Sequence, residues 1–254
     1  MMNEKENVKR AFAKNSNAYV TSSTHSTGPD LPLLIDWLKP QSDMNALDVA
    51  TGGGHVAKHL SKHVANIIAS DLTKEMLNNT AKYLHSYTNI KYAVADAEEL
   101  PFDNNTFDIV TCRIAAHHFP TPDKFIAEVC RVLKPDGKFM LIDNVAAEEQ
   151  TLDNFVNKVE KMRDYSHVRS HTVTEWMALF DKNQLTILKQ QSRKKTLPYK
   201  EWTDRTLMDD QAKHAVSFYL KNAPKRIRDY FQVTITGDEI SSFIIDEWMV
   251  MCKK

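Results

Sequence analysis

Three consecutive glycines, Gly52 to Gly54, follow a short apolar stretch at residues 46–49 and make up half of the six glycines in the chain. Glycine adopts backbone angles that are closed to other residues, and it lets a ligand approach with no Cβ in the way. Such a loop between a buried strand and a helix is typical of a ligand site at the carboxyl edge of a parallel sheet. A tight turn without a ligand is the alternative, but three glycines exceed what a turn requires.

The stretch between about residue 45 and residue 144 alternates short apolar runs with segments of helical period. This alternation is typical of βαβ units and a parallel sheet. A mainly helical stretch without glycine follows at residues 151–231, and Gly237 begins a turn before a final apolar run. We therefore expect an α/β fold. Its strands are predicted at residues 46–49, 66–70, 90–95, 108–112, 138–142, 185–188 and 243–252.

The 254 residues suffice for one large α/β domain with an appended part. We expect an N-terminal helical arm at residues 1–44 and a cofactor-binding core at residues 45–150. Residues 151–254 are expected to hold the last two strands of the sheet and a helical lid, which is inserted between those strands.

Acidic and basic side chains balance in this sequence, with 33 of each. No overall electric field therefore favours nucleic acid, and no run approaches the ~18 apolar residues of a membrane span. The polar N-terminus lacks an apolar signal core, so we expect a cytoplasmic protein without stable membrane insertion. The one basic run, at residues 193–195, is interpreted as a solvated strand end, with a local basic patch as the alternative.

The glycine loop alone leaves the ligand open. Gly52-x-Gly54-x-x-Ala57 fits a dinucleotide-binding fingerprint, and Asp71 lies 19 residues after Gly52, where a ribose-binding acid is expected. A nicotinamide cofactor is therefore one possibility. Against it, Asp48 adds a carboxylate inside the first strand, and Asp96 adds another after the third, where it can meet an adenine amino group.

Four segments, at residues 47–54, 71–77, 96–102 and 131–137, together resemble class I S-adenosylmethionine-dependent methyltransferases. The likeness is to the ubiquinone/menaquinone biosynthesis C-methyltransferase-like group, also described as methyltransferase type 11. Ala50 stands where many members carry the first glycine. The resemblance implies a three-layer Rossmann-like fold whose seven-stranded, mostly parallel sheet has an antiparallel last strand.

The resemblance also implies S-adenosyl-L-methionine as the cofactor. It places Asp71 on the ribose, Asp96 and Ala97 beside the adenine, Met76 against the adenine, and the glycine loop beside the methionyl part. The expected cofactor-binding residues are Asp48, Ala50, Thr51, Gly52, Gly54, Asp71, Leu72, Met76, Asp96, Ala97 and Arg113.

Methyl transfer from a sulfonium needs orientation and a water-poor site, and it needs a base only when the acceptor must lose a proton. His117 and His118 follow the fourth strand and are the candidate catalytic groups, since histidine titrates near neutrality. Adjacent side chains diverge, so we expect one histidine to face the pocket and the other to pack. Neither this pair nor the three scattered cysteines predicts a metal site. The candidate substrate residues are Tyr19, His25, Asp143, Tyr165 and His167.

These features predict an enzyme that transfers a methyl group from S-adenosylmethionine to the carbon or oxygen of a small molecule. A nicotinamide-dependent oxidoreductase is the alternative. A nucleic-acid methyltransferase is disfavoured by the neutral charge and by the lack of an Asn-Pro-Pro-aromatic motif. The oligomeric state stays open, with a homodimer as one possibility, and so does closure of the N-terminal arm over the cofactor.

Overall fold

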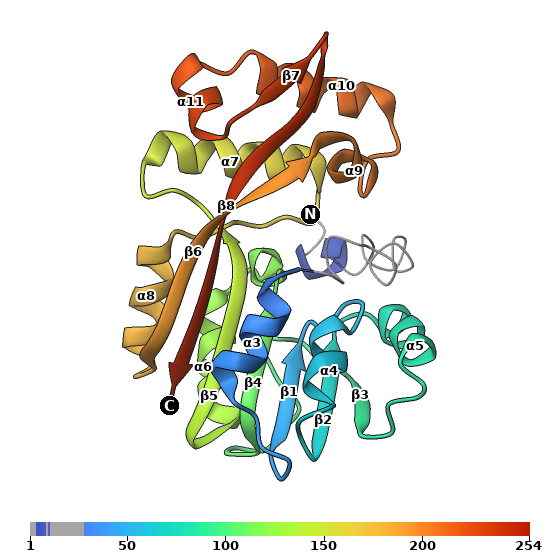
Figure 1. Ribbon diagram of the computed structural model, residues 1–254, viewed down its shortest axis with the longest axis vertical. Coiled ribbons are helices and arrows are strands. Elements are labelled where there is room, and N and C mark those ends of the chain that lie inside the picture. Colours follow the sequence, from blue (N-terminus) through green and yellow to red (C-terminus); the bar gives the residue numbers. More distant parts are fainter. Residues whose placement is uncertain (1–3, 9, 11–27) are drawn as a thin grey trace.

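The computed structural model describes residues 4–8, 10 and 28–254, and these residues form an α/β fold around one large sheet (Figure 1). The strand order is β3-β2-β1-β4-β5-β8-β6, and β7 pairs with β8 away from this path. The strands are β1 (Asn45–Val49), β2 (Asn66–Asp71), β3 (Ile90–Val94), β4 (Phe107–Arg113), β5 (Leu133–Val145), β6 (Thr186–Pro198), β7 (Thr234–Thr236) and β8 (Glu239–Lys253).

The first five strands pair in parallel, whereas β8 runs antiparallel to both β5 and β6. The predicted α/β class and the antiparallel last strand are therefore confirmed. The sheet has eight strands rather than seven because β7, only three residues long, pairs with the first part of β8.

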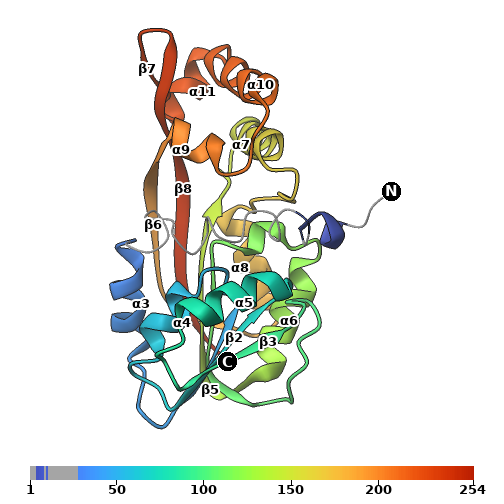
Figure 2. The same cartoon turned by 90° about the vertical axis from the view of Figure 1, so that its right-hand side faces the viewer.

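Helices cover both faces of this sheet and form the three expected layers. Figure 2 shows α3 and α6 on opposite sides of the strands. Residues 4–8 and 10 are also helical and precede α3 in the chain. The helices are α3 (Asp30–Leu38), α4 (His55–Leu60), α5 (Lys74–Tyr83), α6 (Pro122–Val132), α7 (Gln150–Arg163), α8 (Val173–Lys182), α9 (Tyr199–Asp204), α10 (Asp210–Lys221) and α11 (Lys225–Tyr230), with the 3₁₀ turn η1 at Ala116–His118.

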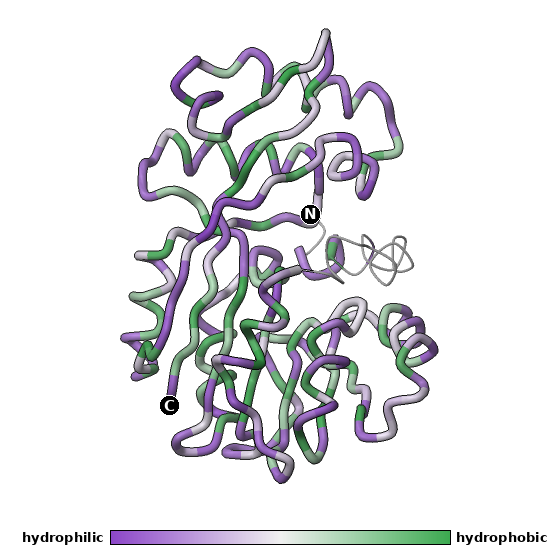
Figure 3. Tube along the Cα trace, viewed as in Figure 1, coloured by the Kyte–Doolittle hydropathy of each residue, from purple (hydrophilic) through white to green (hydrophobic). Residues whose placement is uncertain are grey.

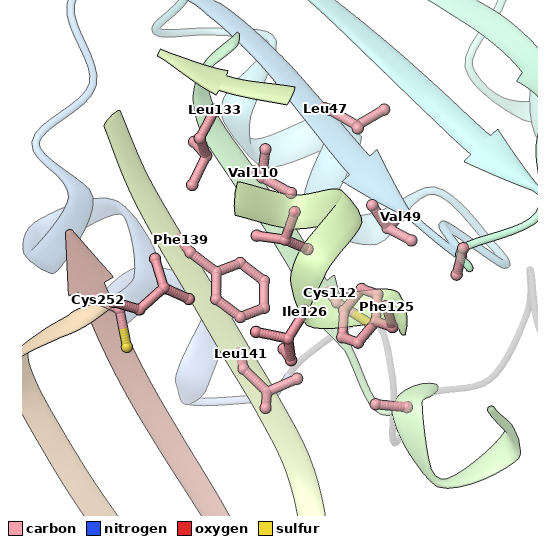
Figure 4. Close-up of a cluster of buried hydrophobic side chains, with 14 of the residues drawn as sticks. Leu47, Val49, Val110, Cys112, Phe125, Ile126, Leu133, Phe139, Leu141 and Cys252 are labelled. Carbon is pink, nitrogen blue, oxygen red and sulfur yellow. The ribbon is translucent and has the colours of Figure 1, made fainter. Parts of the chain in front are cut away.

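Two hydrophobic clusters hold the helical layers onto the sheet. On one side Phe125 and Ile126 of α6 meet Phe139 and Leu141 of β5, as Figure 4 shows. On the other side the buried residues of α3 and α4 pack on β1, β2 and β5. All these side chains are almost fully buried, and burial of apolar area at ~25 cal/mol per Å² is the main force that fixes the layers.

Two strands, β5 and β6, extend far beyond the apolar runs predicted for them. β5 begins at Leu133, because Leu133 pairs with Phe107 and a register shift before Ile109 absorbs the extra residues. β6 continues to Pro198 although most of its side chains are exposed and polar. An edge strand of this kind is held by backbone bonds to β8, so hydropathy does not reveal it.

The helical insert lies between β6 and β8, as predicted, and contains α9, α10, α11 and β7. It forms the upper part of the molecule in Figure 1, where α7 packs against α10. Figure 3 shows apolar residues on the inner side of these segments and polar residues on the outer turns. A third hydrophobic cluster, centred on Phe155, Trp202 and Phe243, holds the insert together. Every helix in the described ranges is too short or too polar to cross a lipid bilayer.

Candidate functional site

A cavity lies at the carboxyl edge of the parallel strands, where the loops after β1, β2, β3 and β4 meet. We call it the edge cavity. It brings together nine of the eleven residues predicted to bind the cofactor, which come from segments far apart in the sequence. They are Asp48, Ala50, Thr51, Gly52, Asp71, Leu72, Asp96, Ala97 and Arg113.

The glycine loop begins the wall of the edge cavity. Gly52 has φ +51°, and a Cβ built there would meet no atom within 4 Å, so a side chain at this position would project into open space. Gly54 has φ +76°, but its Cβ would lie 2.5 Å from Cγ2 of Thr80 on α5. Gly52 therefore leaves space in the cavity that a side chain would occupy. Gly54 does not line the cavity, and its small size permits close packing of the loop against a helix.

Two residues with side chains also adopt the left-handed backbone conformation at this edge. Ala50 has φ +52° directly after β1, and Ile114 has φ +53° directly after β4. A positive φ is a strong outlier for a β-branched residue such as isoleucine. Both line the edge cavity, so two strained backbone positions lie where the loops turn away from the sheet.

Replacing Ala50 with glycine is expected to raise the free energy of unfolding by about 0.5–1 kcal/mol. Relief of the left-handed strain exceeds the extra chain entropy that glycine loses on folding. Ala93, in the interior of β3, has an ordinary φ, so Ala93→Gly should lower stability instead. Urea unfolding of both variants measures the difference, and two losses of similar size would contradict the strain at Ala50.

A buried carboxylate, that of Asp48, forms part of the floor of the edge cavity. The hydroxyl of Thr51 donates to Asp48 Oδ2 (2.6 Å), and the hydroxyl of Thr111 donates to Oδ1 (2.8 Å). Burial raises the pKa of Asp48 to about 6, although these bonds and the charge of Arg113 oppose the shift. The site is therefore prepared for a cationic partner, because ionised Asp48 is held at a cost in this protein.

The energetic cost of ionising buried Asp48 should appear as a pH-dependent difference in stability between the Asp48→Asn variant and the wild type. The folded-state pKa of Asp48, about 6, lies above the ordinary aspartate pKa of 3.8. The folded protein therefore loses stability from this group as the pH rises from about 4 to about 6. We expect Asp48→Asn to unfold at higher urea than the wild type at pH 7.5, by up to about 3 kcal/mol. At pH 4 the difference should largely vanish, and an equal difference at both pH values would contradict the shift.

Asp71 ends β2 and connects the cavity to the glycine loop. The backbone N–H of Gly52 donates to Asp71 Oδ2 (3.1 Å), and that of Thr73 donates to Oδ1 (3.0 Å). Burial raises the pKa of Asp71, while the hydrogen bonds from these two backbone N–H groups oppose the increase. The carboxylate is thus fixed in position, and each oxygen retains lone pairs that a ligand hydroxyl could use.

The third carboxylate of the edge cavity, Asp96, follows β3. Its Oδ1 accepts from the backbone of Glu98 (2.9 Å), and its Oδ2 lies 2.6 Å from Nζ of Lys5. The same Lys5 ammonium lies 2.8 Å from Glu98 Oε2. Lys5 and Val8 both line the cavity, so part of the N-terminal arm contributes to its wall. The sequence gives no sign of this contribution, because no motif surrounds Lys5.

The two candidate catalytic histidines lie in η1 and diverge, as expected. His118 lines the edge cavity, and its Nδ1 donates to the carbonyl of Ser166 (2.9 Å), so Nε2 carries the lone pair. His117 points away from the cavity, where Nδ1 donates to Asp143 Oδ1 (2.6 Å) and the backbone N–H donates to Oδ2 (2.9 Å). The two rings are 4.3 Å apart.

The two rings have opposite electrostatic surroundings. Burial alone would lower the pKa of His117, but the Asp143 carboxylate outweighs burial and raises it. Burial and the charge of His117 lower the pKa of His118 to about 4. The ring that faces the cavity is therefore neutral near pH 7 and can accept a proton or a hydrogen bond.

The candidate substrate residues are only partly brought together. Asp143 and His167 are buried beside His117, with 5.6 Å between the His117 and His167 rings, but neither lines the edge cavity. Tyr165 is 51% exposed on the loop after α7 and also lies off the cavity. Tyr19 and His25 fall outside the described residues.

Met76, predicted to pack against the cofactor, is fully buried and lies off the wall of the edge cavity. Its position on α5 follows the helical period, which directs this side chain into the protein interior. Within residues 4–8, 10 and 28–254, no three His, Cys, Asp or Glu side chains are placed to hold a metal ion.

Comparisons with known proteins agree with this geometry. Residues 47–141 match the model of a family described as a methyltransferase domain. The uncharacterized methyltransferase YcgJ of Bacillus subtilis is 36% identical over 234 residues, which cover 91% of this chain and 92% of that protein. The ubiquinone/menaquinone biosynthesis C-methyltransferase UbiE of Rickettsia prowazekii is 40% identical over 125 residues, 46% of this chain and 50% of that protein.

Solved structures give the same result. The crystal structure of the YcgJ protein from Bacillus subtilis has a TM-score of 0.86 and 35% identity, and the match covers 88% of this chain and 97% of that one. A crystal structure of a Bacillus halodurans protein has a TM-score of 0.87 and 34% identity, with coverage of 89% and 99%. The predicted resemblance is thereby confirmed, and the chain belongs to the methyltransferase family of enzymes.

Proposed function

We propose that this methyltransferase takes its methyl group from S-adenosyl-L-methionine and transfers it to the carbon or oxygen of a small molecule. The observation that carries the proposal is the edge cavity, where three adjacent parallel strands bring together the carboxylates of Asp48 in β1, Asp71 at the end of β2 and Asp96 after β3. Only the glycine loop and Asp71 supported a nicotinamide cofactor, and membership of the methyltransferase family adds no support for it.

The residues of the edge cavity fit the proposed cofactor group by group. Asp71 is suited to accept from ribose hydroxyls, and Asp96 is suited to accept from the adenine amino group. Asp48, ionised at a cost, suits the ammonium of the methionyl part. The open space at Gly52 leaves room for the methionyl chain to pass close to the backbone.

The bound cofactor would supply an electrophilic methyl group, so the protein need not activate the donor. What this chain adds is orientation, a site shielded from water, and a neutral imidazole. His118 is our candidate for the group that accepts a proton from the methyl acceptor, since it is the histidine of η1 that lines the edge cavity. His117 and Asp143 are positioning residues in this proposal, because they lie behind His118 and set its charge environment.

Likeness to UbiE over half of that protein's length favours carbon as the methylated atom. The test is transfer of a deuterated methyl group from S-adenosylmethionine to a panel of small phenols, enols and carboxylic acids, read by mass spectrometry. A mass increase that needs the protein supports the proposal, and the fragment that carries the label distinguishes carbon from oxygen. Methylation of tRNA or DNA in place of every small molecule would contradict it.

A further inference from the structure

The basic run at residues 193–195 is not the solvated strand end that the sequence suggested. It lies in the middle of β6, and its side chains alternate between the two faces of the sheet. Lys194 Nζ pairs with Asp246 Oδ1 (2.6 Å), whereas Arg193 and Lys195 both pair with Glu247. Arg193 and Lys195 lie on the same face of β6, so both contact the same carboxylate, that of Glu247.

Arg193 and Lys195 belong to a largely buried ion network that joins α3, β4, β6 and β8. Asp30 and Glu247 are each 1% exposed, and Arg193 bridges them, with its Nη2 donating to Asp30 Oδ1 (3.0 Å). Arg113 also pairs with Asp30, and Lys195 Nζ lies 3.0 Å from Glu247 Oε2. Although burial opposes it, the two arginines lower the pKa of Asp30 to about 2.

In this network three cationic side chains surround two carboxylates. Glycine at position 28 is needed beside it, since a Cβ there would lie 2.7 Å from Nη2 of Arg113 and closer still to Asp30. Arg113 also acts on the carboxylate of Asp48, so the three cations of this region are balanced by three carboxylates.

A second cavity, of about 310 Å³, opens onto this network. We call it the basic cavity, and its lining residues are Gly28, Pro29, Asp30, Arg113, Arg193, Lys194 and Lys195. Arg113 lines both the basic cavity and the edge cavity, so the two share a wall. Arg193 Nη1 and two of the three N–H groups of Lys195 bond no acceptor among the described residues. Donors thus remain for a ligand in the basic cavity.

We propose that the basic cavity holds an anionic group of the methyl acceptor, a carboxylate or a phosphate, through Arg193 and Lys195. Four cationic side chains and one carboxylate line the basic cavity, and a guanidinium beside an ammonium suits two oxygens of one oxyacid. The acceptor would extend past Arg113 so that its reacting atom enters the edge cavity. This inference rests on the proposed function, and it narrows the substrate class to small acids.

The test is calorimetric titration of the protein, saturated with S-adenosylhomocysteine, with inorganic phosphate and separately with acetate at constant ionic strength. Saturation blocks the edge cavity, so the remaining anion site is measured. Lys195→Gln is expected to weaken anion binding about tenfold, because a charge-assisted bond is lost. Lys189→Gln is the matched control, with the same charge change at an exposed position of β6 outside the basic cavity, and should alter binding less than about threefold.

Arg193→Lys provides a second variant in case Lys195→Gln leaves Glu247 too poorly paired to fold. It keeps both charges of the pair but removes the planar fork, so affinity should fall about fivefold. The stronger of phosphate and acetate identifies the oxyacid. This inference would be overturned if the anion bound the Arg193 and Lys195 variants as tightly as the wild type. It would also be overturned if S-adenosylhomocysteine bound the wild type but no anion did. Failure of S-adenosylhomocysteine to bind the wild type would instead overturn the proposed function.

Discussion

Replacing Asp71 with alanine is expected to weaken binding of S-adenosylmethionine about 100-fold, since two hydrogen bonds to a carboxylate contribute ~1.5 kcal/mol or more each. The loss should exceed that of the ligand contacts alone, because Asp71 also holds the Gly52 and Thr73 amides of the cavity wall. Calorimetry measures the affinity, and thermal unfolding shows whether the variant remains folded.

The matched control for this prediction is Asp36→Ala, which removes one carboxylate from the exposed side of α3. Its affinity should equal that of the wild type. Asp71→Asn should resemble Asp71→Ala, because an amide presents a donor toward at least one of the two backbone N–H groups. Full affinity in Asp71→Asn would contradict the role assigned to the carboxylate.

Replacing His118 with alanine is expected to lower kcat about 100-fold or more while affinity for S-adenosylhomocysteine changes less than about twofold. The imidazole lines the edge cavity and is neutral above pH 5, because its pKa is lowered to about 4. A loss in kcat without a loss in cofactor affinity separates proton transfer from binding. The assay uses whichever acceptor the labelled-methyl screen identifies.

His85→Ala is the matched control for His118→Ala. Its Nδ1 also bonds a backbone carbonyl, that of Lys82, but the side chain is exposed on the surface. Turnover should be unchanged in this control. If His118→Ala turned over at the wild-type rate, His118 would have no part in proton transfer, and the acceptor would be one that needs no base.

Much of the edge cavity could be predicted from sequence because it is built from strand ends. Asp48 lies near the end of an apolar run, Asp71 and Asp96 follow two others, and parallel strands bring their carboxyl ends to one edge. Gly54 fitted the same motif, but its small size is required by Thr80 and Leu84 of the neighbouring α5 region. A sequence motif shows that glycine is needed, not which neighbour needs it.

Other features of the site depend on tertiary contacts that leave no periodic signal. Lys5 meets Asp96 across 91 positions of sequence, and the strain at Ile114 is a matter of backbone angle rather than of residue type. The length of β6 was underestimated because its exposed polar residues lack the alternation expected of a half-buried strand. The sequence therefore suggested a strand end for Arg193, although this residue lies within the sheet and pairs with two buried carboxylates, those of Asp30 and Glu247.

The central claim is that the edge cavity binds S-adenosylmethionine, and calorimetric titration with S-adenosylhomocysteine tests it most directly. Carrying out the titration at pH 7.5, with NAD in a parallel cell, compares the two ligands that the glycine loop allows. We predict saturable binding of one S-adenosylhomocysteine per chain and none of NAD. No detectable heat or thermal stabilisation with millimolar S-adenosylhomocysteine, or stabilisation by NAD alone, would contradict the claim.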